Sequence, residues 1–182
     1  MLPKTGITAN LTIPVLLMIG LCTASVGKTI YVDDDATGLN NGSSWADAYN
    51  YLQDAMADAN DSEKPVEIRV AKGVYMPDQG VSQTLGDQEA TFQLINRVTL
   101  KGGFAGFGEP DPDDRNVAIY ATILSGNLNG DWNSYHVVTG SYTNETAVLD
   151  GFIITGGNAN GPQLEDEQPG EYRLKRGGGM YN

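Results

Sequence analysis

The chain has 182 residues, of which 40% are hydrophobic, and it carries a formal net charge of −12. This length allows one domain or a portion of a larger one, and the apolar content is too high for a disordered chain. The excess of acidic residues argues against the basic face that nucleic acid requires, and the single cysteine excludes an internal disulfide framework or a multi-cysteine zinc site.

Residues 1–27 are predicted to be a signal peptide. Lys4 gives a positive start, the segment 11–21 (LTIPVLLMIGL) is an apolar core, and small residues follow in TASVG. This order is typical of secretion, and the apolar run is too short for a comfortable transmembrane helix. Cleavage after Gly27 is expected, with cleavage after Ala24 as the alternative. We therefore predict a protein that is secreted or displayed at the cell surface or outer membrane, with no membrane-spanning segment in the mature chain.

Residues 28–65 are expected to form an N-terminal strand and a helix. Residues 30–32 form the strand, and the three aspartates 33–35 end it, because aspartate is disfavoured in strands and favoured in turns.

Apolar residues recur at helical spacing over 44–60, Ser44 is a suitable N-cap, and Asp47 resembles the partner residue of a capping box. No second amphipathic helix is predicted to pair with this one. A stack of strands exposes its core and its edges at an open end, so the helix is predicted to cap that end.

Residues 66–182 read as short strands punctuated by glycine. Leu100, Leu124 and Ile154 each stand two residues before a glycine and are 24 and 30 residues apart, which is a length typical of stacked repeats. Two-residue hairpin signals are few, which argues against a β-sandwich. We predict an all-β fold, the N-terminal coils of a right-handed parallel β-helix with glycines at its corners. The expected strands cover 66–70, 74–76, 91–100, 122–124, 135–139 and 148–155.

Two segments resemble the start of pectate-lyase-like right-handed β-helix proteins: YVDDDATGLNNGSSWADAYNYLQDAMADA and VEIRVAKGVYMP. Later segments, among them VTLKGGFAGFGE, VLDGFIITGGNANG and GGGMYN, resemble exported bacterial proteins of that superfamily with repeats like those of polymorphic outer membrane proteins. The resemblance implies that the coils continue beyond Asn182, so that 66–182 is a truncated portion.

The resemblance also implies what catalysis would require. Polysaccharide lyases of this fold use a basic residue for proton abstraction, with calcium held by carboxylates. Arg69, Arg97 and Lys101 are the basic residues on expected strands, and no carboxylate cluster is evident beside them. We expect all three to be solvated, outward-facing residues. No catalytic, cofactor-binding or metal-binding residue is predicted, although calcium stays open as a cofactor.

Two oxygen-rich segments are candidate metal sites. Asn127, Asn129 and Asp131 alternate as the oxygens of a calcium loop do, but the later glutamate and the following helix are missing. A polar turn is the favoured interpretation, and a strand-ending turn is likewise favoured for residues 33–35.

Ordinary packing is predicted for the remaining candidates. His136, the single histidine, lies in a strand-like run and is expected to be a structural or surface residue. Trp132, Tyr135 and Tyr142 could form a platform for sugar stacking, but packing at a coil edge is favoured. Phe104 and Phe107 are expected to pack a corner rather than bind a ligand.

The predicted function is a structural, adhesive or carbohydrate-binding role outside the cell. The expected partner is a polysaccharide or cell-surface glycan, and the protein is expected to be a monomer. One alternative is a pectate-lyase-like polysaccharide lyase or glycoside hydrolase whose active coils lie beyond Asn182. Another is the passenger segment of an outer-membrane translocated protein. Carboxylates near an Arg or Lys on downstream coils would favour the enzyme.

Overall fold

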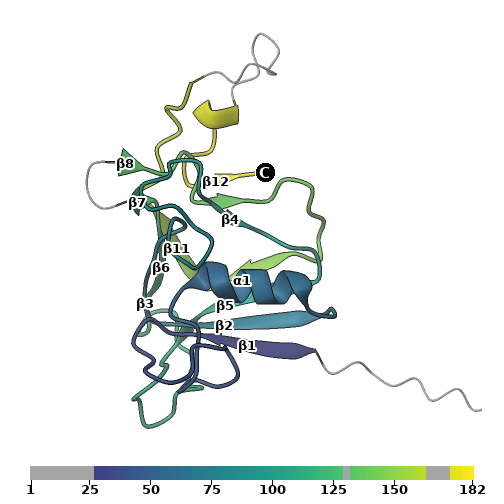
Figure 1. The fold of residues 1–182 in the computed structure, drawn as a ribbon, viewed down its shortest axis with the longest axis vertical. Coiled ribbons are helices and arrows are strands. Elements are labelled where there is room, and N and C mark those ends of the chain that lie inside the picture. The colour runs from purple at the N-terminus through teal and green to yellow at the C-terminus, as the bar shows by residue number, and fades with distance from the viewer. Residues whose placement is uncertain (1–26, 129–131, 163–172) are drawn as a thin grey trace, which may run out of the picture.

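The protein is described by a computed structural model that places residues 27–128, 132–162 and 173–182 (Figure 1). The predicted signal peptide up to residue 26 lies outside these ranges, as do Asn129 and Asp131 of the weighed calcium loop. Within the described residues the regular structure is mostly strand, with one α-helix of 10 residues. The β-rich character predicted from the sequence is confirmed.

Three small parallel sheets make up most of the fold. Sheet A has the order β1 (Lys28–Val32), β2 (Val66–Ala71), β5 (Val98–Phe104) and β10 (Val148–Asp150). Sheet B joins β3 (Gly73–Tyr75), β6 (Thr122–Ser125) and β11 (Phe152–Thr155), and sheet C joins β4 (Phe92–Gln93), β9 (Val138–Thr139) and β12 (Met180–Tyr181). An antiparallel pair, β7 (Asn127–Leu128) and β8 (Trp132–Asn133), lies between β6 and β9, and a short 3-10 helix (Arg173–Lys175) precedes β12.

The chain visits the sheets in a fixed order. It runs A, B, C through β2, β3 and β4, again through β5, β6 and β9, and a third time through β10, β11 and β12. We call these three stretches the first, second and third passages. Strands of successive passages pair side by side in each sheet, and every such pair is parallel.

Inward-facing residues line up from one passage to the next. Leu100 lies opposite Ile68 on one side and Leu149 on the other in sheet A. In sheet B, Leu124 lies between Tyr75 and Ile154 in the same way. The expected equivalence of Leu124 with Ile154, which are 30 positions apart, is confirmed, but Leu100 is not equivalent to them because it belongs to a different sheet.

The repeat length varies more than the expected 24 to 30 residues, and most aligned pairs are farther apart than that. Aligned residues are 32 positions apart between Ile68 and Leu100, but 49 apart between Leu100 and Leu149. Long loops, such as 105–121 between β5 and β6, add residues within a passage and do not change which strands pair.

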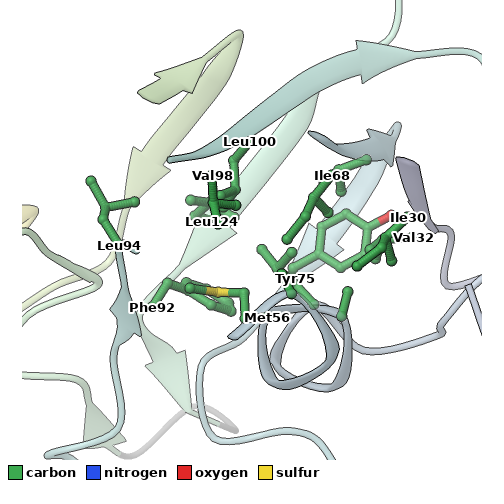
Figure 2. Packing of buried hydrophobic residues seen from close by; sticks show 14 of the residues in the cluster. Ile30, Val32, Met56, Ile68, Tyr75, Phe92, Leu94, Val98, Leu100 and Leu124 are labelled. Atoms are coloured by element: carbon green, nitrogen blue, oxygen red, sulfur yellow. The ribbon is translucent and has the colours of Figure 1, made fainter. Parts of the chain in front are cut away.

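One core lies between the three sheets and the helix (Figure 2). Ile68 comes from sheet A, Leu124 from sheet B and Phe92 from sheet C, and each is 0% exposed. Met56 reaches this core from helix α1 (Leu52–Asp61) and lies beside Phe92 in Figure 2. Burial of this apolar surface is the main stabilising contribution, at about 25 cal/mol per Å² removed from water.

Helix α1 is shorter than the predicted 44–60. Residues 44–51 form turns, and the bond expected of a capping box forms there without a helix, because Asp47 N–H donates to Ser44 Oγ at 3.1 Å. Tyr49 exchanges backbone hydrogen bonds with β1, donating to Tyr31 O at 2.9 Å and accepting from Asp33 N at 2.9 Å. A residue paired with a strand edge cannot also make helical hydrogen bonds, so the helix begins after it.

Two predicted strands are each divided by a corner. Residues 91–100 contribute β4 to sheet C and β5 to sheet A, with Arg97 at φ +60° between them. Residues 148–155 divide at Gly151, φ +83°, into β10 and β11. This left-handed backbone conformation favours glycine and turns the chain from one sheet to the next. The predicted strand 135–139 shortens to Val138–Thr139.

Candidate functional site

Three open hollows adjoin one another along helix α1 and the residues just before it. Hollow I, about 430 Å³, is lined on the helix by Asp54, Asp58 and Asp61, and it shares Gln83 with hollow II. Hollow II, about 440 Å³, includes Asp78 in its wall. These volumes lie within the range of small-molecule sites.

Hollow III, about 610 Å³, continues the series toward the end of β1. It shares Tyr51 and Gln79 with hollow II, and its wall also includes Asp34, Asp35 and Asn50. Together we call them the α1 hollows. No lysine or arginine lines any of the three among the described residues.

The loop 76–91 forms one wall of hollow II. It consists of successive turns, with Gln83 N–H donating to Gly80 O at 3.2 Å and Asp87 N–H donating to Thr84 O at 3.2 Å. Glycine, serine and aspartate favour such turns over a strand. Gln53 Nε2 of α1 donates to Pro77 O at 2.7 Å and to Thr91 O at 3.0 Å, so the helix holds both ends of the loop.

Two carboxylates of the α1 hollows each have one oxygen without a partner. Asp78 is only 1% exposed; its Oδ2 accepts from Gly86 N at 2.9 Å, and its Oδ1 is buried with no hydrogen bond to the described part of the chain. Asp54 repeats the arrangement, because Oδ1 accepts from Val81 N at 2.9 Å while Oδ2 is buried and unpaired. A buried polar atom without a partner costs free energy, so a donor that reached either oxygen would remove that cost.

The aspartates 33–35 form the predicted strand-ending turn. Asp33 is buried, and its two carboxylate oxygens accept from Asp35 N at 3.0 Å and from Phe107 N at 2.6 Å. Carboxylate oxygens of the three residues lie within 4.8 Å of one another. Burial raises the pKa of Asp34, and the neighbouring charges of Asp35 and Asp33 raise it further. Asp33 thus joins the end of β1 to the loop after β5.

The basic residues of sheet A have a carboxylate partner that sequence reasoning missed. Arg69 Nε lies 2.7 Å from Glu67 Oε1, and Lys101 Nζ lies 2.6 Å from Glu67 Oε2. Burial would raise the pKa of Glu67, but the hydrogen bonds from Lys101 and Arg69 outweigh it and hold the pKa below its ordinary value. The alternation in VEIRV could have shown that Glu67 and Arg69 share the outer face.

Arg69 and Lys101 face outward as expected, but they are half-buried and ion-paired instead of freely solvated. Arg97 is exposed as expected, and its guanidinium donates to Lys64 O at 3.1 Å. None of the three lines the α1 hollows.

The histidine and one of the predicted corner phenylalanines have structural surroundings. His136 is buried and stacks on Tyr181, with ring centroids 5.1 Å apart, as a structural residue would. Phe104 is buried and packs against Trp45, whereas Phe107 is 37% exposed.

The favoured packing at a coil edge is wrong for two of the three candidate aromatic residues. Trp132 and Tyr142 are exposed, and the ring contacts in the described part of the chain join other residues. Asn127, the one described member of the weighed calcium loop, lies in β7. The residue that sequence reasoning overlooked is Tyr51, which is 43% exposed and lies between hollows II and III.

Comparison with known proteins adds no relative: no protein-family model, curated protein or solved structure matches the chain. Within the described ranges, no helix has the length and apolar character needed to span a membrane. The candidate site therefore depends on its geometry alone. That geometry offers acceptors, amides and one exposed aromatic ring, which suit binding a polar ligand.

Proposed function

We propose that this chain forms the first coils of a right-handed parallel β-helix that works outside the cell as a glycan-binding protein. The repeated order of sheets A, B and C and the aligned inward residues support the fold. Connections between parallel strands of one sheet are right-handed in nearly all known cases, which supports the hand. The predicted signal peptide supports export.

The capping role of α1 belongs to the same proposal. Its buried residues join the core at the side of β1 and β2, and Gln53 supplies hydrogen bonds to carbonyl oxygens at both ends of the loop between β3 and β4. A helix that covers apolar surface and satisfies strand-end carbonyls is what the first coil of such a stack requires.

The observation that carries the binding function is the position of Tyr51. Its partly exposed side chain lines both hollow II and hollow III, with the amides of Gln79 and Gln83 in the surrounding walls. An aromatic ring offers a flat apolar face to the C–H face of a sugar, while amides donate to and accept from hydroxyl groups. The chemistry of the walls is thus suited to carbohydrate.

A binding assay tests this function. The purified protein is titrated with a panel of neutral, acidic and amino-sugar oligosaccharides, and each affinity is measured by calorimetry. Tyr51→Ala should weaken the best ligand by about 1 kcal/mol or more, because the stacking face is lost. Tyr142→Ala is the matched control, since Tyr142 is fully exposed and lies outside the hollows.

Equal binding by wild type and Tyr51→Ala would contradict the proposed site. Release of unsaturated or reducing sugars during the titration would contradict the non-enzymatic role and favour the lyase or hydrolase alternative. N-terminal sequencing of the exported protein checks the signal peptide: the mature chain is expected to begin at Lys28, or at Ser25 if cleavage follows Ala24.

A further inference from the structure

The most unusual feature of the α1 hollows is a buried carboxylate that lacks a donor. Asp78 is almost wholly removed from water, yet its Oδ1 has no hydrogen-bond partner among residues 27–128, 132–162 and 173–182. An ionised group in such a place costs free energy unless it is paired. Asp78 lines hollow II, so a ligand that enters this hollow can supply the donor.

The surroundings specify the charge of that donor. No lysine or arginine lines the α1 hollows among the described residues, while Asp34, Asp35, Asp54 and Asp78 all do. A concave surface lined by one sign of charge concentrates ligands of the opposite sign. Uronic acids would be repelled, and a neutral hydroxyl would gain less than a cation from the unpaired carboxylate.

We infer that the α1 hollows bind an amine-bearing sugar oligomer, whose ammonium group donates to Asp78 Oδ1 in hollow II. This inference rests on the proposed glycan-binding function and narrows it to one class of ligand. Tyr51 stacks on the ring of the same or the next sugar unit. A second ammonium group reaches Asp54 Oδ2 in hollow I, past the shared Gln83.

A divalent metal ion fits hollow II less well than an ammonium group. Calcium takes six to eight oxygen ligands, and Asp78 is the single carboxylate residue in the wall of this hollow. The hollow, at about 440 Å³, also has room for a sugar ring and not only for an ion. An ammonium group needs only a few acceptors, which Asp78 and the amide oxygens of Gln79 and Gln83 can supply.

The first experiment compares ligands on the wild-type protein by calorimetry. Glucosamine tetramers should bind about tenfold or more tightly than N-acetylglucosamine tetramers, because acetylation removes the charge that pairs with Asp78. Galacturonic acid tetramers should bind most weakly. The preference for the amine should shrink as salt increases, since part of the attraction comes from exposed charges.

The second experiment removes the charge of Asp78. Asp78→Asn should weaken glucosamine tetramer binding by about 10- to 100-fold, as expected for loss of a charged hydrogen bond. Binding of the acetylated tetramer should change little. Glu145→Gln, which removes a charge from an exposed turn away from the hollows, is the matched control and should leave both affinities unchanged.

Stability distinguishes a binding aspartate from a structural one. Without ligand, Asp78→Asn should unfold at about the same urea concentration as wild type, because the amide oxygen can keep the bond from Gly86 N and the amide nitrogen takes the position that is already unpaired. Gln83→Lys gives a second variant, in which the new ammonium group lies in the wall shared by hollows I and II. It should stabilise the free protein and abolish the preference for the amine.

The outcomes separate this inference from the proposed function. Equal binding of the acetylated and free tetramers, or unchanged affinity in Asp78→Asn, overturns the inference and leaves glycan binding intact. Calcium binding that is lost in Asp78→Asn overturns it in favour of a metal site. Tight binding of spermidine that does not depend on Tyr51 overturns the sugar assignment. Failure of every oligosaccharide to bind overturns the proposed function itself.

Discussion

β1 and β10 are the two outermost strands of sheet A, and their outer edges have different surroundings. Along β1, Tyr31 N–H donates to Gly42 O at 3.0 Å and Asp33 N–H donates to Tyr49 O at 2.9 Å. The segment before α1 thus covers this edge. β10 has a single partner strand, β5, among the described residues, and β11 and β12 likewise end their sheets.

The burial of equivalent residues follows this difference in cover. Ile30 of β1 is 0% exposed, as is Leu100 in the second passage. Leu149 and Ile154 face inward in the third passage, yet they are only partly buried. The comparison teaches that each passage depends on a neighbour for its core, because a single passage cannot enclose its own interior.

The largest expected effect compares aligned leucines of sheet A. Leu100→Ala should lower the free energy of unfolding by about 2 to 5 kcal/mol, because it leaves a closed cavity. Leu149→Ala should cost about 1 to 2 kcal/mol, since a partly exposed side chain leaves less empty volume. Urea denaturation of both variants measures the difference. Equal losses would show that the third passage is as well covered as the second.

The next effect concerns two glycines with nearly the same backbone angle. Gly106 has φ +86°, and a Cβ there would lie 2.3 Å from Asp33 Oδ2 and 2.5 Å from Ala71 Cβ. Gly86 has φ +80°, with nothing within 4 Å of the added Cβ. Gly86→Ala should cost about 1 kcal/mol from the left-handed conformation alone. Gly106→Ala should cost about 2 to 4 kcal/mol, because overpacking adds to that strain.

Thermal unfolding of the two alanine variants separates crowding from backbone strain. Gly106 lies where the loop after β5 meets Asp33 at the end of β1, so its variant tests how tightly this region is packed. Identical melting temperatures for the two variants would mean that the loop moves aside freely and that Asp33 does not anchor it.

The smallest effect is the pH dependence of Glu67. Its folded pKa lies below the ordinary 4.5, so its ion pairs stabilise the fold above about that pH and are lost as the pH falls through the folded pKa. Glu67→Gln should therefore cost up to about 1 kcal/mol at neutral pH and nothing at strongly acidic pH, because the pairs are partly exposed. Urea midpoints at several pH values give the profile.

The contribution of Asp34 to stability changes with pH in the direction opposite to that of Glu67. Its folded pKa is raised above 3.8, so its contribution to stability decreases as the pH rises from 3.8 through the folded pKa. Asp34→Asn should slightly stabilise the protein at neutral pH and lose this advantage in acid. A destabilised Asp34→Asn at neutral pH would show that the charge supports the fold.

Local pattern predicted much of the fold. The alternation in VEIRV correctly gave a strand with Ile68 inside, and the apolar spacing after Leu52 correctly gave a helix with one buried face. The same spacing over 44–51 was misleading, because Tyr49 pairs with β1. Helical spacing indicates which residues of 44–51 face the core. The backbone conformation of this segment is instead determined by the long-range hydrogen bonds of Tyr49.

The candidate site shows the limit of sequence more sharply. Asp54 and Asp78 do not belong to a recognisable sequence motif. What distinguishes them is that one carboxylate oxygen of each is buried without a partner among the described residues. Tyr51 was predicted to lie on a helix, and it instead stands exposed just before one. No local sequence pattern predicts that these carboxylate oxygens are buried, because their burial depends on the loop 76–91 folding back toward α1.

The sequence by itself determined the short strands, their inward and outward faces and the turn at residues 33–35, because these depend on residue types a few positions apart. Tertiary structure decided which strands are neighbours and where charges meet. Lys101 lies opposite Arg69 and shares Glu67 with it, although Glu67 and Lys101 are 34 residues apart. Because the loops differ in length, no fixed sequence period predicts this strand register. The register is determined by how whole passages pack against one another.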